Sequence, residues 1–165
     1  RSHGERSPAA VLRAVNRQLY PDMKEDMFIS MAYVVIHRRT GEAHLARAGH
    51  DAPLFCSTSA ASVEILNPKG MAVGIDSGEV FDRFCTDLSF RFGDGDILLL
   101  YTDGLTEALD AAGGEFGMDR LSSELLASAS EGAGEILRRL ARSVKAFSSG
   151  QPQHDDITLI AIKKT

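Results

Sequence analysis

The sequence has few of the features that mark specialised classes of protein. No run of Lys and Arg is longer than a pair, and the formal net charge is −5, which argues against nucleic acid as the partner. No apolar run approaches the ~20 residues that a membrane-spanning helix needs. The polar residues 1–6 contain no apolar signal core. These absences favour a globular domain without a membrane segment.

Cysteine is also scarce. Only Cys56 and Cys85 are present, far apart and without a C-x-x-C spacing. Two buried, reduced thiols are the simplest interpretation, and they favour a cytoplasmic location. Histidine forms no cluster with cysteine, so a zinc site is not expected. Neither a G-x-S-x-G string nor a P-loop is present, which leaves serine or cysteine nucleophile chemistry without support.

The chain does contain enough apolar material for one folded domain. Of its 165 residues, 44% are hydrophobic and 25% are charged, as in an ordinary globular domain with a core. No repeat or low-complexity tract divides it. The chain begins with Arg rather than an initiator Met, and we expect it to have been cut from something longer.

Hydrophobic patterning predicts the order of the elements. Helical spacing predicts a helix at residues 8–19, begun by a Ser7 cap and Pro8, and two helices near the C-terminus, around Leu121 and Leu140. Strands are predicted at residues 27–36, 42–48, 54–56, 63–66, 80–88, 97–101 and 157–162. The strand at 27–36 is interpreted as a central one, covered on both faces. Strands followed by helices indicate an α+β fold with antiparallel sheets.

Two acidic positions adjoin predicted strands. Asp103 follows the apolar strand 97–101 and precedes Gly104, while Asp155 and Asp156 precede the last strand. Converging carboxylates at strand ends would form an all-oxygen site for Mg²⁺ or Mn²⁺. Each signal alone is weak, because Asp-Gly is a common turn dipeptide and an Asp pair is usually solvated.

In combination, these strings resemble the sporulation-stage-II-protein-E branch of the metal-dependent (type 2C-like, PPM) protein serine/threonine phosphatases. The most specific string is Leu100-Tyr101-Thr102-Asp103-Gly104-Leu105-Thr106-Glu107, followed later by Asp155-Asp156-Ile157-Thr158. The resemblance covers essentially the whole chain, through residues 26–30, 40–41, 46–50, 70–75, 93–108, 114–117 and 154–159.

The resemblance implies a two-sheet antiparallel β-sandwich flanked by helices. Two Mn²⁺ or Mg²⁺ ions, held by aspartates, would share a water that attacks the phosphorus in line. By match of motif, Asp103 and Asp155 would be the metal ligands. Asp156, Gly104 and His50 would lie beside them without binding the ions, His50 in a mainly structural role.

The chain departs from the family pattern at its N-terminus. The family's first strands and helix carry an aspartate in a Gly-Asp-Val-Ser-Gly-like string, which bridges the two ions. No such string occurs here. We therefore expect residues 1–165 to be a phosphatase domain that lacks its N-terminal strands and first helix. Alone, it should be inactive and weakly stable or self-associating.

Two functions from different classes remain open. The first is hydrolysis of phosphoserine or phosphothreonine on an anti-anti-sigma-type regulatory protein, with a sensor or receiver domain upstream. The second is a non-catalytic, phosphatase-like module that binds a regulatory protein. Retention of both Asp103 and Asp155 favours the enzyme, since a binding module has no physical need for them. A receiver domain is excluded, because it would need alternating strands and helices around a parallel sheet.

Overall fold

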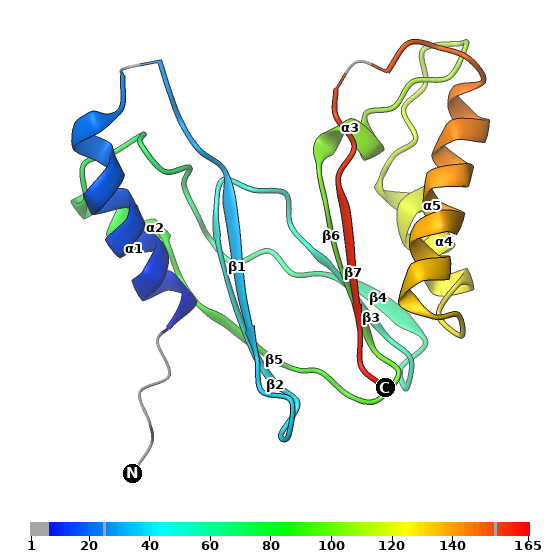
Figure 1. The fold of residues 1–165 in the computed structure, drawn as a ribbon, viewed down its shortest axis with the longest axis horizontal. Helices are drawn as coiled ribbons and strands as arrows, with labels where there is room; N and C mark the ends of the chain where they lie inside the picture. Colours follow the sequence, from blue (N-terminus) through cyan, green and yellow to red (C-terminus); the bar gives the residue numbers. More distant parts are fainter. Residues whose placement is uncertain (1–6, 25, 154) are drawn as a thin grey trace. The chain divides into compact units, whose positions relative to one another are not determined.

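A computed structural model of the protein describes residues 7–24, 26–153 and 155–165 (Figure 1). The chain divides into two compact units. The first comprises Arg1–Ala52 and Asn67–Phe92, and the second comprises Pro53–Leu66 and Gly93–Thr165. Each unit has its own antiparallel sheet and its own helices.

The first unit has a three-stranded sheet in the order β1-β2-β5. Ser7 begins its long helix, because the Ser7 hydroxyl accepts a hydrogen bond from the Ala10 N–H at 3.0 Å. The elements of this unit are α1 (Pro8–Leu19), a 3-10 turn (Tyr20–Asp22), β1 (Met31–Ile36), β2 (Glu42–Ala48), α2 (Glu79–Phe84) and β5 (Leu88–Arg91).

Helix α1 covers the sheet of the first unit through a small apolar core. Leu12 is fully buried against the strand residues Ala46 and Ala48, with Phe81 and Cys85 from the α2 region in the same cluster. Burying a leucine of this kind contributes about 2 kcal/mol. The small side chains of β2 let the helix approach the sheet closely.

The second unit has a four-stranded sheet in the order β4-β3-β6-β7. All its neighbouring strands pair antiparallel, and β6 lies inside the sheet with β3 on one side and β7 on the other. Its elements are β3 (Leu54–Ser57), β4 (Ser62–Ile65), β6 (Ile97–Tyr101), α3 (Asp103–Thr106), α4 (Met118–Ala127), α5 (Ala133–Ser148) and β7 (Leu159–Lys163).

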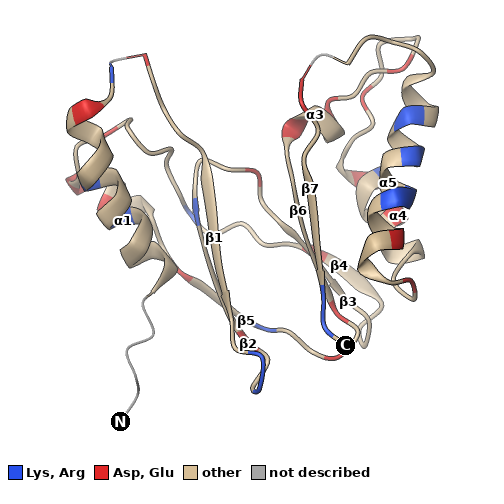
Figure 2. Cartoon of the chain, in the orientation of Figure 1, with Lys and Arg blue, Asp and Glu red and all other residues tan. Residues whose placement is uncertain are grey.

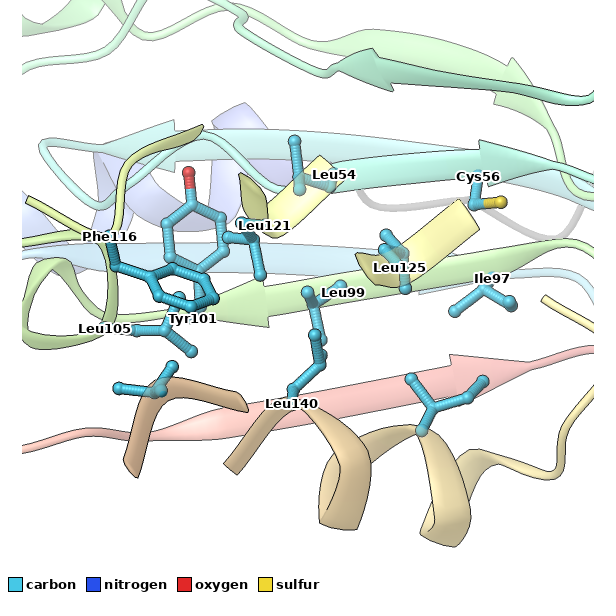
Figure 3. Packing of buried hydrophobic residues seen from close by; sticks show 12 residues of the cluster. Leu54, Cys56, Ile97, Leu99, Tyr101, Leu105, Phe116, Leu121, Leu125 and Leu140 are labelled. Atoms are coloured by element: carbon cyan, nitrogen blue, oxygen red, sulfur yellow. The ribbon is translucent and has the colours of Figure 1, made fainter. Parts of the chain in front are cut away.

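Helices α4 and α5 bury one face of this second sheet. Figure 3 shows Leu140 of α5 below Leu99 of β6, with Leu121 and Leu125 of α4 in the same cluster. All four leucines are fully buried. This core fixes β6 on a rigid support, which matters because the strand leads directly to Asp103.

The prediction of an α+β fold with two antiparallel sheets and helices is confirmed. The helix at residues 8–19 and the strand at 97–101 have their predicted bounds. Within the part of the chain that the structure describes, no helix is both long and apolar enough to cross a membrane.

The prediction of a strand at residues 80–88 is wrong. The segment forms α2 and then β5, which begins only at Leu88. The Asp76 carboxylate accepts hydrogen bonds from the N–H groups of Gly78, Val80 and Phe81, each at 3.0 Å, and thereby starts a helix. Burial of Phe81 then outweighs the strand preference of the local sequence.

The interpretation of residues 27–36 as a central strand covered on both faces is also wrong. The strand begins at Met31, and β1 is an edge strand of its sheet. Phe28 is 64% exposed and Tyr33 is 39% exposed. Helix α1 packs on β1 and Met31 joins the core beneath that helix, whereas Phe28 and Tyr33 remain exposed among the described residues.

We expect this edge to make the isolated 165-residue chain self-associate, because an uncovered apolar edge strand pairs with other chains. Sedimentation velocity at about 100 μM should show dimers or larger species. Tyr33→Lys, which places a charge on the edge, should shift the chain toward monomer, while Leu126→Lys on the partly exposed surface of α4 should not. A wild-type chain that stays monomeric would contradict this expectation.

Candidate metal centre

Asp103 stands where the buried strand β6 ends. Ile97, Leu98 and Leu99 of that strand are fully buried, whereas the Asp103 side chain is exposed. Its Oδ1 accepts a hydrogen bond from the Gly104 N–H at 2.8 Å, and its second carboxylate oxygen has no recorded partner among the described residues. A rigid strand thus presents a carboxylate oxygen to solvent.

Thr102 ties this strand end to the segment that carries Asp155 and Asp156. Its hydroxyl donates to the Asp156 carbonyl oxygen at 2.8 Å and accepts from the Thr158 N–H at 2.9 Å. The Thr102 N–H also donates to the Thr158 carbonyl oxygen at 3.2 Å. Sequence reasoning missed Thr102 as a positioning residue. The sequence feature that could have revealed it is a hydroxyl side chain placed directly between a strand and an aspartate. Hydroxyl groups in such places form hydrogen bonds with nearby backbone groups.

Gly104 allows the two segments to meet. A Cβ at this position would lie 2.8 Å from the Asp156 carbonyl oxygen and 2.9 Å from that of Asp155. The sequence suggested that Gly104 serves a sharp backbone turn, but it lies inside α3 and its φ is not positive. Gly104 is therefore required for close approach of two backbones rather than for an unusual conformation.

Asp155 and Asp156 both have exposed side chains in the loop before β7. The Asp155 Oδ1 accepts the Asp156 N–H at 2.7 Å, and the Asp155 carbonyl oxygen accepts from the Gln153 side chain at 2.7 Å. Strand alternation does not separate the two carboxylates, because β7 begins only at Leu159. The choice of Asp155 as the ligand stays a prediction that rests on the motif.

The donor set fits a hard cation in kind. Asp103 and Asp155 offer only carboxylate oxygens, the ligands that Mn²⁺ and Mg²⁺ prefer, and the second unit has no described His or Cys beside them. Over the residues that the structure describes, no group of three or more His, Cys, Asp or Glu side chains gathers as a metal site would require. Two carboxylates alone would supply only part of a coordination shell.

Asp76, another carboxylate that could bind a metal ion, is already engaged in hydrogen bonds with the backbone of the first unit. The N–H groups of Phe81 and Gly78, followed by that of Val80, hold the pKa of its carboxyl below the usual range. The same hydrogen bonds begin α2, so binding a metal through Asp76 would cost the start of that helix.

His50 has a backbone role in the first unit. The Arg47 guanidinium donates to the His50 carbonyl oxygen and to the Asn67 side chain, which joins β2 both to the turn after it and to the loop after β4. The His50 Nδ1 lies 3.1 Å from the Asp51 carbonyl oxygen. The structural role expected for His50 and its expected place beside the metal ligands both stay predictions. His154, which belongs to the same motif as Asp155, lies outside the described residues.

A sequence profile of the family described as Stage II sporulation protein E (SpoIIE) matches residues 2–165. The chain belongs to the SpoIIE family. The resemblance drawn from the motifs is thereby confirmed.

Relatives and solved structures agree with this membership. The chain is 33% identical over 136 residues to protein IcfG of Synechocystis, and 26% identical over 159 residues to the phosphoserine phosphatase RsbU of Bacillus subtilis. These matches cover 82% and 95% of the chain, but only 20% and 45% of the two relatives, so the chain spans less than half of either.

The fold matches the SiaA-PP2C domain of Pseudomonas aeruginosa with a TM-score of 0.82, at 21% identity, over 99% of this chain and 62% of that one. This member of the family therefore has the fold of a PP2C-type phosphatase domain and is related to the phosphoserine phosphatase RsbU.

The close approach at Gly104 gives a testable expectation. Gly104→Ala should lower the free energy of unfolding by about 1–3 kcal/mol, because its methyl group would press on the backbone of Asp155 and Asp156. Urea unfolding followed by circular dichroism measures this loss. The control is Gly134→Ala in α5, where a Cβ meets only the Arg138 side chain at an ordinary 3.7 Å. That change should leave stability unchanged or raise it by up to about 1 kcal/mol. Equal stability of the two variants would contradict the role of Gly104.

Proposed function

We propose that the protein hydrolyses phosphoserine or phosphothreonine on a regulatory protein of the anti-anti-sigma type, with Asp103 and Asp155 as ligands of Mn²⁺ or Mg²⁺. The junction of β6 with the segment before β7 carries this proposal. There, the Thr102 hydroxyl and the space left by Gly104 hold two exposed aspartates on adjoining backbones. Family membership and the relation to RsbU support the same reaction class.

The residues of this chain bind and orient. Asp103 would hold its ion from the end of a buried strand, and its hydrogen bond with the Gly104 N–H restricts the side chain's rotation. Asp155 would bind from the neighbouring segment, which Thr102 fixes in place. When bound, two such ions would supply an activated water and a clamp on the phosphate oxygens. Because two carboxylates do not complete such a centre, we propose that further ligands come from outside residues 1–165.

The same reasoning favours an enzyme over a non-catalytic binding module. A binding surface does not require exposed carboxylates on a rigid strand end, nor the tight backbone contact at Gly104 that supports them. We also propose an upstream sensor or receiver domain, which the shares of 20% and 45% in the longer relatives support. A cytoplasmic location is proposed from the two free, buried cysteines Cys56 and Cys85.

Asp103→Asn in the complete protein should reduce Mn²⁺-dependent hydrolysis of a phosphoserine protein at least about a hundredfold. Asparagine keeps the Oδ1 that accepts the Gly104 N–H, so the free energy of unfolding should change by less than about 0.5 kcal/mol. Steady-state kinetics and urea unfolding measure the two quantities. Mn²⁺ titration calorimetry should show weaker binding in the variant. Wild-type turnover in Asp103→Asn would overturn the assignment.

Asp155→Ala and Asp156→Ala separate the two neighbouring carboxylates. We expect Asp155→Ala to lower kcat/KM at least about a hundredfold, and Asp156→Ala to lower it by less than about fivefold. The hydrogen bond between Asp156 and Thr102 uses the carbonyl oxygen of Asp156, which alanine at this position retains. The pair is matched in charge, exposure and position in the loop. A larger loss for Asp156→Ala would show that Asp156 is the ligand.

A further inference from the structure

A pocket of about 730 Å³ opens beside Asp155 in the second unit. Its walls come from α3 and the residues after it, from one side of α5, and from the loop that leads to β7. Apolar side chains line much of it, including Ala108, Val144, Ile157 and Leu159. This volume lies within the range of small-ligand sites, and it is ample for one long side chain.

Charged groups surround this apolar lining. Glu107, Glu115 and Asp155 contribute carboxylates, and Lys145 contributes one ammonium group. If Asp155 is assigned to a metal ion, two carboxylates remain against one ammonium. Among the described residues, the side chains of Glu107, Glu115 and Lys145 have no recorded ion pair or hydrogen bond. The pocket therefore carries net negative charge that the rest of the described chain does not neutralise.

The remaining basic residues of α5 behave differently. Arg138 and Arg142 pair with Glu135, and Arg139 pairs with Glu124 and Glu131. Figure 2 shows this sequence of charges along α5. The arginines of α5 are therefore neutralised by glutamates of α5, of α4 and of the loop between the two helices, and none of these glutamates lines the pocket.

The pocket lies within reach of a peptide bound at the metal centre. Glu107 follows Asp103 by one helical turn, and its N–H donates to the Asp103 carbonyl oxygen at 2.8 Å. Four residues of helix rise by about 6 Å, and about two residues of an extended peptide cover the same length.

We propose that this pocket binds a lysine or arginine side chain of the phosphoprotein substrate, about two residues from the phosphorylated serine or threonine. The inference rests on the proposed function, because it takes the phosphate to lie at Asp103 and Asp155. The aliphatic stem of the side chain would lie on Val144, Ile157 and Leu159, while its charged end would meet Glu107 and Glu115.

The test uses fluorescent phosphoserine peptides that differ only at the second residue before or after the phosphoserine, where they carry Arg, Leu or Glu. Fluorescence anisotropy with the complete protein and Mn²⁺, on matched peptides that carry a non-hydrolysable phosphonate in place of the phosphoserine, gives the Kd for each residue; kcat/KM is measured on the phosphoserine peptides with Mn²⁺. At one of the two positions, the Arg peptide should bind about fivefold more tightly than the Leu peptide. In the double variant Glu107→Gln/Glu115→Gln, this preference for the Arg peptide over the Leu peptide should fall to twofold or less. Each single variant should lose part of the preference.

Glu64→Gln on β4 is the matched control, since it removes the same charge from an exposed residue that does not line the pocket. It should retain the full preference for Arg. Tighter binding of the Leu or the Glu peptide by wild-type protein would overturn the proposal. So would a preference for Arg that survives the double variant.

The two proposals can fail separately. If the Arg peptide binds with the expected preference but no peptide is hydrolysed with Mn²⁺, the phosphatase function fails and the pocket assignment stands. If all peptides are hydrolysed with equal kcat/KM and bound with equal Kd, the pocket assignment fails and the phosphatase function stands.

Discussion

The antiparallel pairing of β6 with β7 is the interaction on which the candidate site depends. It pairs Tyr101 with Leu159. The end of β6 and the start of β7, which are more than fifty residues apart in sequence, therefore lie side by side at the same end of the sheet. Backbone pairing alone would leave the loop before β7 unplaced. The Thr102 hydroxyl extends the pairing beyond the last strand residue, because it bonds both to the Thr158 N–H and to the Asp156 carbonyl oxygen. The Thr102 side chain thus fixes the position of the loop that carries the proposed ligand Asp155.

This arrangement is supported from below by the core of the second unit. Leu99 of β6 is buried against the helices, so the strand that leads to Asp103 cannot shift without disrupting contacts to Leu140 and its neighbours (Figure 3). Helix α5 also provides one wall of the pocket beside Asp155. The same packing that stabilises the unit therefore fixes where the pocket lies relative to Asp103 and Asp155, the proposed metal ligands.

Much of the fold follows from local sequence, and the failures have physical causes. The helix at residues 8–19 was predictable because its cap and its apolar face lie within the same short segment. The segment 80–88 was misread because the residue that starts α2, Asp76, lies before two small residues and gives no helical periodicity. The edge position of β1 depends on which strands pair, and apolar content does not reveal this.

Asp103 and Asp155 were proposed from the motif. The roles of Thr102 and Gly104 required knowledge of which distant backbone lies against them.

The space at Gly104 and the two hydrogen bonds of Thr102 have a consequence for how this sequence can change over evolutionary time. Valine has the shape of threonine but can make neither bond, and any residue larger than glycine at position 104 meets two carbonyl oxygens. Position 102 is therefore restricted to residues with a hydroxyl group, and position 104 to glycine, as long as the loop before β7 is held in this place. In divergent descendants that keep the aspartate, serine or threonine before it and glycine after it should persist long after the surrounding helices have drifted.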